Sequence, residues 1–198
     1  SFDVNHPSSR TEFDSAVSAM KLDGCSGESG VSIRLIRSLP ECLLQLLFDI
    51  INLCLKWAAI PACFLMALIF LIPKKGVSSL ENSRPISLLE TPLKITTRIV
   101  NTRIISELLD RNFWSDCQFG FLPGRACTSA FHILLAAVED AKTRKMPIFL
   151  CLVDLEKAFD SLESWSLKLS YLFAGLSPRS TSFLLALDGT GKAKVITP

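Results

Sequence analysis

The sequence has few of the side chains that most often carry catalysis or a structural metal. It contains two histidines, His6 and His132, and none of its seven cysteines forms a Cys-x-x-Cys pair. Imidazole catalysis and a zinc site are therefore poorly supported. The odd number of cysteines argues against a disulfide framework, so we expect buried thiols in a reducing environment. His132 stands in a helical pattern, where a helix-surface position fits it best.

An excess of positive or of negative charge is also nearly absent. The chain carries 21 Lys and Arg against 19 Asp and Glu, a net charge of +2 over 198 residues. This balance is too mild to indicate a nucleic-acid partner, so any basic groove must be built locally. With 49% hydrophobic residues the chain is long and apolar enough for one large globular domain or two small lobes.

One long segment lacks charge altogether. It runs from Trp57 to Pro73, and Pro61 interrupts it. Its length is at the lower limit for a membrane span, and a proline inside it breaks a helix. A core segment of a water-soluble protein fits better than a span, and no signal-peptide pattern opens the chain. The second half of the run fits a strand or a helix equally well.

Apolar residues at helical spacing predict several amphipathic helices. These predicted helices cover residues 11–21 with Thr11 as a cap, 33–57 with a break at Pro40, 93–110, and 128 to just before Pro147. The glycine-rich "DGCSGESG" after the first helix predicts a loop. The polar "PKKGVSSLENSRP" between apolar segments predicts a turn or hairpin tip.

A strand is predicted from Ile148 to Val153, because six apolar residues in a row suit a strand that is buried on both faces. Asp154 follows where that strand leaves the core. A helix is predicted to begin at Asp160 or Ser161, with Asp160 as its cap and Glu163 three residues on. Asp160 therefore has a structural explanation, whereas Asp154 is either a solvated loop carboxylate or an oxygen ligand for Mg²⁺.

Four blocks of sequence, in order, resemble the reverse transcriptases of non-LTR (LINE-type) retrotransposons. They are "LIPKKG", "NSRPISLLETPLKI", "QFGFLPGRACTSAFHI" and "LVDLEKAFDSL". Upstream, "LDGCSGESGV" resembles the Lys-Ala-Pro-Gly-Pro-Asp-Gly segment of that family, although Cys25, Ser26, Glu28 and Ser29 depart from it. The combination is far more specific than any one block.

The resemblance implies an α+β fold that is mainly helical, a partial right-hand polymerase. Residues 1–146 would form a fingers-like region, and residues 147–198 the start of the palm with its first catalytic-aspartate strand. Family members continue to a Gly-Gln-Gly-type helix and a hairpin with adjacent aspartates. The chain has no Asp-Asp pair and no Gln-Gly dipeptide. The resemblance therefore implies that the later palm motifs and the thumb are absent.

The same resemblance assigns roles to Asp154 and to the residues that follow it. This residue matches the first metal-binding aspartate of the palm, and the backbone carbonyl of Leu155 would complete the ligands from that strand end. The implied cofactor is Mg²⁺ or Mn²⁺, in a site that is incomplete in this chain. Phe159 matches the aromatic residue that rejects a ribose 2′-hydroxyl, with ordinary core packing as its alternative.

Basic residues of the first two blocks match the fingers side chains that grip a nucleoside triphosphate. Arg84 matches the arginine, whose guanidinium suits phosphate oxygens. Lys74, with Lys75 as the competing choice, matches the lysine that neutralises the same phosphates. A solvated turn is the alternative for both lysines. The prediction places Asp154 beneath Arg84.

The segment from Gln118 to Arg125 is the candidate template-binding element. Gly120 and Gly124 would let backbone amides approach a phosphate, and Arg125 could pair with a phosphate oxygen. Gln118 would form a hydrogen bond with the template, with a polar loop residue as its alternative. The alternative is a tight turn that joins two helices.

The resemblance implies RNA-directed DNA polymerase activity in the parent enzyme, with an RNA template, a DNA primer and dNTPs as partners and no membrane. This fragment alone is predicted to be inactive. It would be intracellular, in the nucleus or the cytoplasm. A non-catalytic RNA-binding or assembly module is the main alternative, and a small membrane protein using residues 57–73 is the other.

Overall fold

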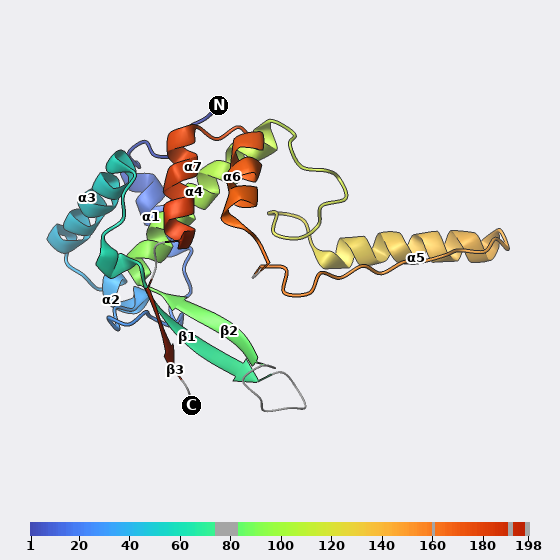
Figure 1. Cartoon of the computed structure of the whole chain (residues 1–198), viewed down its shortest axis with the longest axis horizontal. Coiled ribbons are helices and arrows are strands. Elements are labelled where there is room, and N and C mark those ends of the chain that lie inside the picture. Colours follow the sequence, from blue (N-terminus) through green and yellow to red (C-terminus); the bar gives the residue numbers. More distant parts are fainter. Residues whose placement is uncertain (74–82, 160, 190–191, 197–198) are drawn as a thin grey trace. The chain divides into compact units, whose positions relative to one another are not determined.

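The computed structural model describes residues 1–73, 83–159, 161–189 and 192–196. The chain divides into two compact units. The first comprises Ser1–Ile104 and Ser164–Pro198, and the second comprises Ile105–Glu163. Helices together with a small sheet make the structure α+β, as predicted (Figure 1).

Helices α1 to α4 of the first unit form in the ranges where the apolar spacing predicted helices, and α6 and α7 complete the helices of this unit. Their bounds are α1 Arg10–Ser18, α2 Ile33–Arg37, α3 Glu41–Trp57, α4 Thr91–Asp110, which runs on past the unit boundary, α6 Ser164–Phe173 and α7 Pro178–Gly189, with a short 3₁₀ turn at Ala62–Phe64. The break at Pro40 between α2 and α3 is confirmed. Leu43 and Leu46 of the predicted apolar face of α3 are nevertheless exposed.

Helix α1 begins earlier than its sequence pattern suggested. The hydroxyl of Ser9 accepts a hydrogen bond from Glu12 N, and the Glu12 carboxylate accepts one from Ser9 N. This reciprocal pair satisfies two backbone donors that a helix start leaves free. The predicted cap at Thr11 is therefore wrong, because the Ser-x-x-Glu spacing starts at Ser9.

One hydrophobic core joins the helices of the first unit. Its largest buried side chains come from the amino-terminal segment, from α1 to α4, from the linker between α6 and α7, and from α7: Val4, Phe13, Ile36, Ile51, Leu55, Ile95, Val100, Leu176 and Phe183. The amino-terminal residues are tied in by main-chain hydrogen bonds. Phe2 N donates to Gly175 O at 2.8 Å, and Ser177 N donates to Phe2 O at 2.7 Å.

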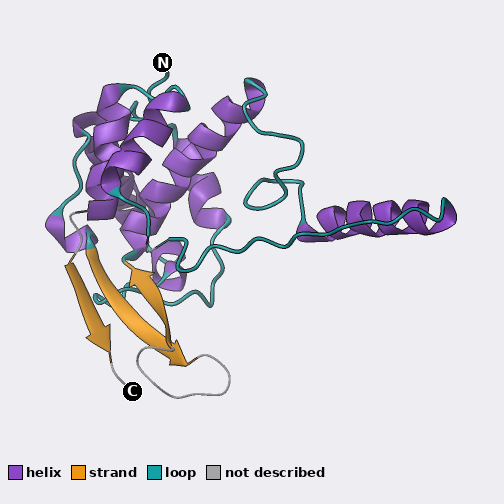
Figure 2. Cartoon of the chain, turned by 45° about the vertical axis from the view of Figure 1, so that its right-hand side comes forward, coloured by secondary structure: helices purple, strands orange, loops and turns teal. Residues whose placement is uncertain are grey.

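The sheet of the first unit has the strand order β2-β1-β3. Strands β1 (Met66–Pro73) and β2 (Ser83–Leu89) pair antiparallel, and β3 (Lys192–Ile196) pairs parallel to β1. Figure 2 shows these strands in orange at one end of the helices of this unit. The antiparallel pairing of β1 and β2 agrees with the predicted hairpin, whose tip at residues 74–82 lies outside the described residues, and the second half of the apolar run is a strand. The prediction that this run is buried was wrong, because only Ala67 of β1 is buried.

The uncharged segment from Trp57 to Pro73 does not form a membrane-spanning helix. In the described ranges no helix is long and apolar enough to cross a membrane. The run from Trp57 to Pro73 divides into the end of α3, a 3₁₀ turn and strand β1.

The prediction for the cysteines was wrong in part. All seven are free thiols, but Cys54 alone is buried and the other six are exposed. Burial raises the pKa of the Cys54 thiol, because the thiolate loses water. Composition alone does not fix exposure, since Cys packs as a small apolar side chain at many sites.

The second unit is built around α5 (Cys127–Thr143), which confirms the predicted helix near Thr128. His132 lies exposed on it, as expected. Beyond α5 the chain turns and runs back beside the helix, as Figures 1 and 2 both show.

The predicted strand at Ile148–Val153 does not form. These residues belong to neither a helix nor a strand, and Phe149, Leu152 and Val153 are 90%, 93% and 83% exposed. A strand that is buried on both faces requires hydrogen-bonded neighbours on both edges. No strand in the described ranges pairs with this segment.

The predicted helix start at Asp160 or Ser161 is also wrong. Helix α6 begins at Ser164, and Asp160 lies outside the described residues. A single turn precedes the helix, in which Ser161 N donates to Lys157 O at 3.0 Å. Local hydrogen bonds of Ser side chains compete with a helix start, and Ser161 Oγ donates to Ala158 O.

The guanidinium of Arg103 on α4 connects three parts of the first unit. It contacts both carboxylate oxygens of Glu12 on α1, at 2.8 and 2.9 Å. It also donates to the carbonyls of Val4 and His6, each at 2.7 Å. The Arg103 side chain is only 9% exposed, so these bonds replace water that the charge has lost.

We expect Arg103→Met to lower the free energy of unfolding by about 2–4 kcal/mol, because buried carbonyls and Glu12 lose a charged donor. Urea denaturation followed by circular dichroism measures this. Arg34→Met is the control, since its ion pair with Asp23 is exposed, and it should cost less than about 1 kcal/mol. Equal losses in the two variants would refute the role of Arg103.

The Arg103 hydrogen bond lowers the pKa of Glu12 below its ordinary value of 4.5. The ion pair therefore stabilises the fold fully above that value, and the stabilisation is lost as the pH falls through the lowered pKa. We expect the free energy of unfolding to depend less on pH in the acid range for Glu12→Gln than for the parent chain. If the free energy of unfolding changes equally with pH in both proteins over the acid range, this expectation is contradicted.

Candidate functional site

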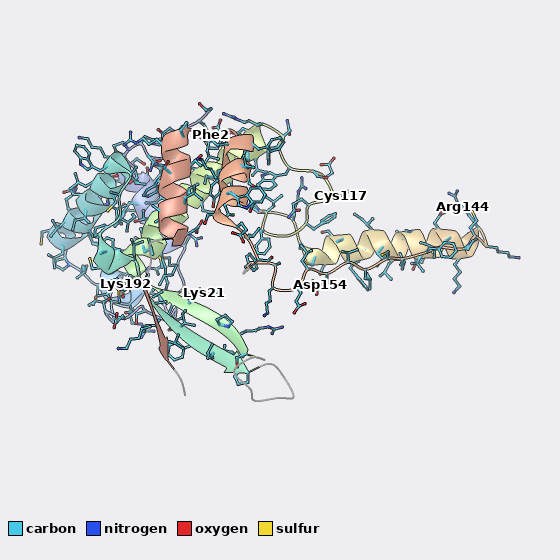
Figure 3. The ribbon with its side chains drawn as sticks, viewed as in Figure 1. Phe2, Lys21, Cys117, Arg144, Asp154 and Lys192 are labelled. Carbon is cyan, nitrogen blue, oxygen red and sulfur yellow. The ribbon has the colours of Figure 1, made fainter. Side chains whose placement is uncertain are left out.

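Asp154 lies in the second unit, in the exposed segment that runs back beside α5. Figure 3 labels it there. Its Oδ1 accepts a hydrogen bond from Leu155 N at 3.0 Å, and this is the one hydrogen bond that the described residues give the carboxylate. The segment thus presents a carboxylate that is open to water, next to the exposed Leu155.

Phe159 lies in the turn that precedes α6, with its side chain 79% exposed. Its carbonyl accepts from Leu162 N at 3.3 Å, so local backbone bonds position the residue. Ordinary core packing, the alternative for this ring, is not what the structure shows. An exposed aromatic ring is free to contact a ligand.

Arg84 lies on β2 in the first unit, and its side chain is exposed. It pairs in register with Ile72 of β1, and the next residue, Pro85, pairs with Leu71. Proline fits here because β2 is an edge strand with one side unpaired. Lys74 and Lys75 lie outside the described residues. Since Arg84 and Asp154 belong to different units, their proximity stays a prediction.

The candidate template segment forms a closed loop in the second unit. Gln118 Nε2 donates to Gly120 O at 2.9 Å. Arg125 Nη1 donates to the carbonyls of Ser115 and Gln118, at 2.6 and 2.9 Å. Gly124 has a φ of +74°, a conformation that suits glycine. The structure therefore brings Gln118, Gly120, Gly124 and Arg125 together, with the arginine bonded to the loop itself.

Metal ligands other than Asp154 do not gather near it in the described residues. No group of three or more His, Cys, Asp or Glu side chains there is arranged to hold a metal ion. The donors present, a carboxylate and the adjacent carbonyl, are hard oxygens of the kind that Mg²⁺ and Mn²⁺ accept. The chemistry of these two donors fits such a cation, although the group contains a single carboxylate.

Sequence reasoning missed Glu90, which is 3% exposed and immediately precedes α4. Its carboxylate accepts hydrogen bonds from the backbone N–H of Ser29, at 2.9 Å, and from the Ser29 hydroxyl. A carboxylate at a helix start is favoured by the helix dipole. The signal was available, because an acidic residue followed by Thr91-Pro92 is typical of a helix amino terminus.

Glu90 holds the glycine-rich loop of residues 23–30 against α4. Gly27 is buried against it, and a Cβ on this glycine would lie 2.6 Å from Glu90 Oε1 and 2.8 Å from Glu90 N. Two further bonds fasten the same loop, from the Thr91 hydroxyl to Val31 O and from Lys94 Nζ to Cys25 O at 2.6 Å. The loop that resembles the family's Gly-Pro-Asp-Gly segment is thus clamped to α4.

Comparison with known families gives a match to the reverse transcriptase (RNA-dependent DNA polymerase) family over residues 72–193. A probable RNA-directed DNA polymerase from transposon BS of Drosophila melanogaster is 29% identical over 151 residues, 75% of this chain and 17% of that protein. An RNA-directed DNA polymerase from mobile element jockey of Drosophila funebris is 29% identical over 156 residues, 78% of this chain and 17% of its own length.

A third relative is the retrovirus-related Pol polyprotein from the type-2 retrotransposable element R2DM of Drosophila melanogaster. It is 27% identical over 158 residues, which are 79% of this chain and 14% of the polyprotein. The chain thus spans less than a fifth of the length of these relatives. The family match covers more than half of the chain, which therefore belongs to the reverse transcriptase family. The predicted non-LTR retrotransposon type is confirmed.

We expect Gly27→Ala to destabilise the first unit by about 1–3 kcal/mol, because the added methyl collides with the backbone and carboxylate of Glu90. Thermal denaturation measures the loss, and amide hydrogen exchange at Ser29 should accelerate. Gly120→Ala is the control, since its added Cβ would meet only Gln118 Nε2, at 3.9 Å. If the two variants are equally stable, Gly27 has room that the structure does not show.

Proposed function

We propose that this chain supplies the fingers and the first part of the palm of an RNA-directed DNA polymerase. Its substrates would be an RNA template, a DNA primer and dNTPs. The family match over residues 72–193 carries the proposal, because it spans Arg84, Asp154 and Phe159 in the order of the sequence blocks. In the proposal, residues 1–146 act as the fingers-like region and residues 147–198 as the start of the palm.

The carboxylate of Asp154 and the carbonyl of Leu155 are the proposed ligands for Mg²⁺ or Mn²⁺. Support comes from their exposure and from the free lone pairs of a carboxylate that accepts one short-range hydrogen bond. When bound, such ions activate a primer hydroxyl and stabilise the leaving pyrophosphate. The role of the chain is to hold these two oxygens at adjacent positions of one exposed segment.

Arg84, Lys74 and Lys75 are the proposed contacts to the triphosphate. The antiparallel pairing of β1 and β2 supports this, because Pro73 pairs with Ser83 and so brings the two ends of the intervening segment together. The two lysines follow Pro73 directly, and Arg84 follows Ser83. Cations on one end of a hairpin can approach a single anionic group.

Phe159 is proposed to exclude a ribose 2′-hydroxyl by bulk. Its exposed ring and its place five residues after Asp154 support the assignment. A side chain that selects deoxyribose must reach the sugar, and its backbone must be held in place. The turn hydrogen bonds around Phe159 supply that fixed backbone.

The segment from Gln118 to Arg125 is proposed to contact template. The carbonyl bonds of Arg125 close the loop, so its ordered backbone would offer the contact surface, with Gly120 and Gly124 permitting close approach. Arg125 Nη2 lies 3.7 Å from Asp116 Oδ1, a long ion pair that leaves this nitrogen able to reach a phosphate.

The chain alone is proposed to be inactive. Two divalent ions held about 3.5–4 Å apart need more than one carboxylate. Losing this arrangement removes most of a rate enhancement that commonly exceeds about a millionfold.

We expect primer extension on poly-rA/oligo-dT with Mg²⁺ to stay at background for the chain alone. Millimolar Mn²⁺ should still broaden the NMR amide signal of Leu155 selectively, and Asp154→Asn should abolish the broadening. Asp140→Asn is the matched control, an exposed aspartate of the same unit that pairs with Arg144. Broadening that survives Asp154→Asn would refute the assignment of Asp154, and primer extension above background by the parent chain would refute its predicted inactivity.

A further inference from the structure

A second basic site lies in the first unit, apart from the residues assigned above. A cavity of about 630 Å³ opens between the end of α1, the glycine-rich loop, α2 and α4. Its volume falls within the range of small-molecule and cofactor sites, about 300–1,000 Å³. Figure 3 labels Lys21, which lines the cavity just after α1.

Charges of one sign gather in this cavity. Lys21, Lys94 and Arg98 line it, and no Asp or Glu is among its lining residues. Ile33 supplies an apolar wall and Asn101 an amide. The hydroxyls of the lining threonines donate to carbonyls already, so the cations and the amide are the available donors.

The three cations differ in how they are held. Lys94 Nζ donates to Cys25 O at 2.6 Å, and burial lowers the pKa of this amine because its charged form loses water. Lys21 Nζ and the Arg98 guanidinium have no hydrogen bond or ion pair with any residue of the described ranges. One cation is thus fixed in place, and two are free to close on a ligand.

The carboxylates around the cavity are occupied elsewhere. Glu90, which attracts the Lys94 amine, accepts both of its hydrogen bonds from Ser29. Glu12 lines a neighbouring cavity that also contains Arg98, but its two oxygens pair with Arg103. Glu90 offsets part of the Lys94 charge, and the three lining cations still leave the cavity with a net positive charge.

We propose that this cavity binds a phosphate group, carried by a nucleotide or by an RNA strand. Lys94 anchors one phosphate oxygen, Arg98 offers a guanidinium fork to the others, and Lys21 closes the site from its rim. The RNA source rests on the proposed function, whereas the phosphate chemistry rests on the cavity alone. The site would hold its ligand without contact to Asp154.

Binding of fluorescein-labelled oligo-rU to the full chain, measured by fluorescence anisotropy, tests the proposal together with direct titration calorimetry of AMP and of inorganic phosphate. The test variant is Lys21→Gln with Arg98→Gln, two exposed side chains whose loss leaves the core intact. The control variant is Lys56→Gln with Lys168→Gln, which removes the same charge outside the cavity. Lys21→Gln with Arg98→Lys keeps the charge at position 98 and should bind more tightly than the test variant does.

The expected result is that the test variant binds RNA about tenfold more weakly and that its salt dependence falls by about 0.7 in log–log slope, the value for one phosphate contact on a single strand. The control variant should match the parent. If AMP binds and RNA does not, with the same variant effect, the site takes a nucleotide and the RNA part of the proposed function fails.

Two results would overturn the cavity proposal. If the test variant binds RNA and AMP as tightly as the parent does, the phosphate is held elsewhere, and the proposed RNA template role stands. If the parent binds none of the three probes, the cavity has no phosphate site. Thermal denaturation of each variant confirms that lost binding does not reflect lost folding.

Discussion

The ion pair between Arg103 and Glu12 is the contact on which the first unit depends most. It joins α4 to α1, and the remaining donors of the guanidinium hold the carbonyls of the amino-terminal segment. That segment in turn pairs through Phe2 with the linker between α6 and α7. The buried Arg103 guanidinium thus holds the amino-terminal segment to α1 and α4, and this segment connects them to the linker between α6 and α7.

Local patterns predicted much of this fold. Helical spacing identified α3, α4 and α5, and polar turn residues between two apolar runs identified the hairpin of β1 and β2. Each of these signals lies within one short segment. The order of the blocks predicted the family, which the match over residues 72–193 confirms.

Features that depend on distant partners escaped prediction. The segment Ile148–Val153 has strand composition, but pairing decides whether a strand forms, and no described strand pairs with it. The clamp of Glu90 on Ser29 joins residues that are far apart in sequence, as does the basic cavity, so neither shows in a sequence pattern. The assigned roles of Asp154, Phe159 and Arg84 came from the family resemblance and remain predictions.

The parallel pairing of β3 with β1 has a consequence for how the chain is made. Met66 pairs with Lys192, so the third strand of the sheet comes from a segment that a ribosome releases long after the hairpin. At about 5–20 residues per second, the hairpin would wait on the order of ten seconds with one edge of β1 unpaired. An open edge of apolar residues is a template for wrong pairing. Because synthesis proceeds from the amino terminus, this hairpin is a suitable substrate for chaperones that cover unpaired strands of a nascent chain.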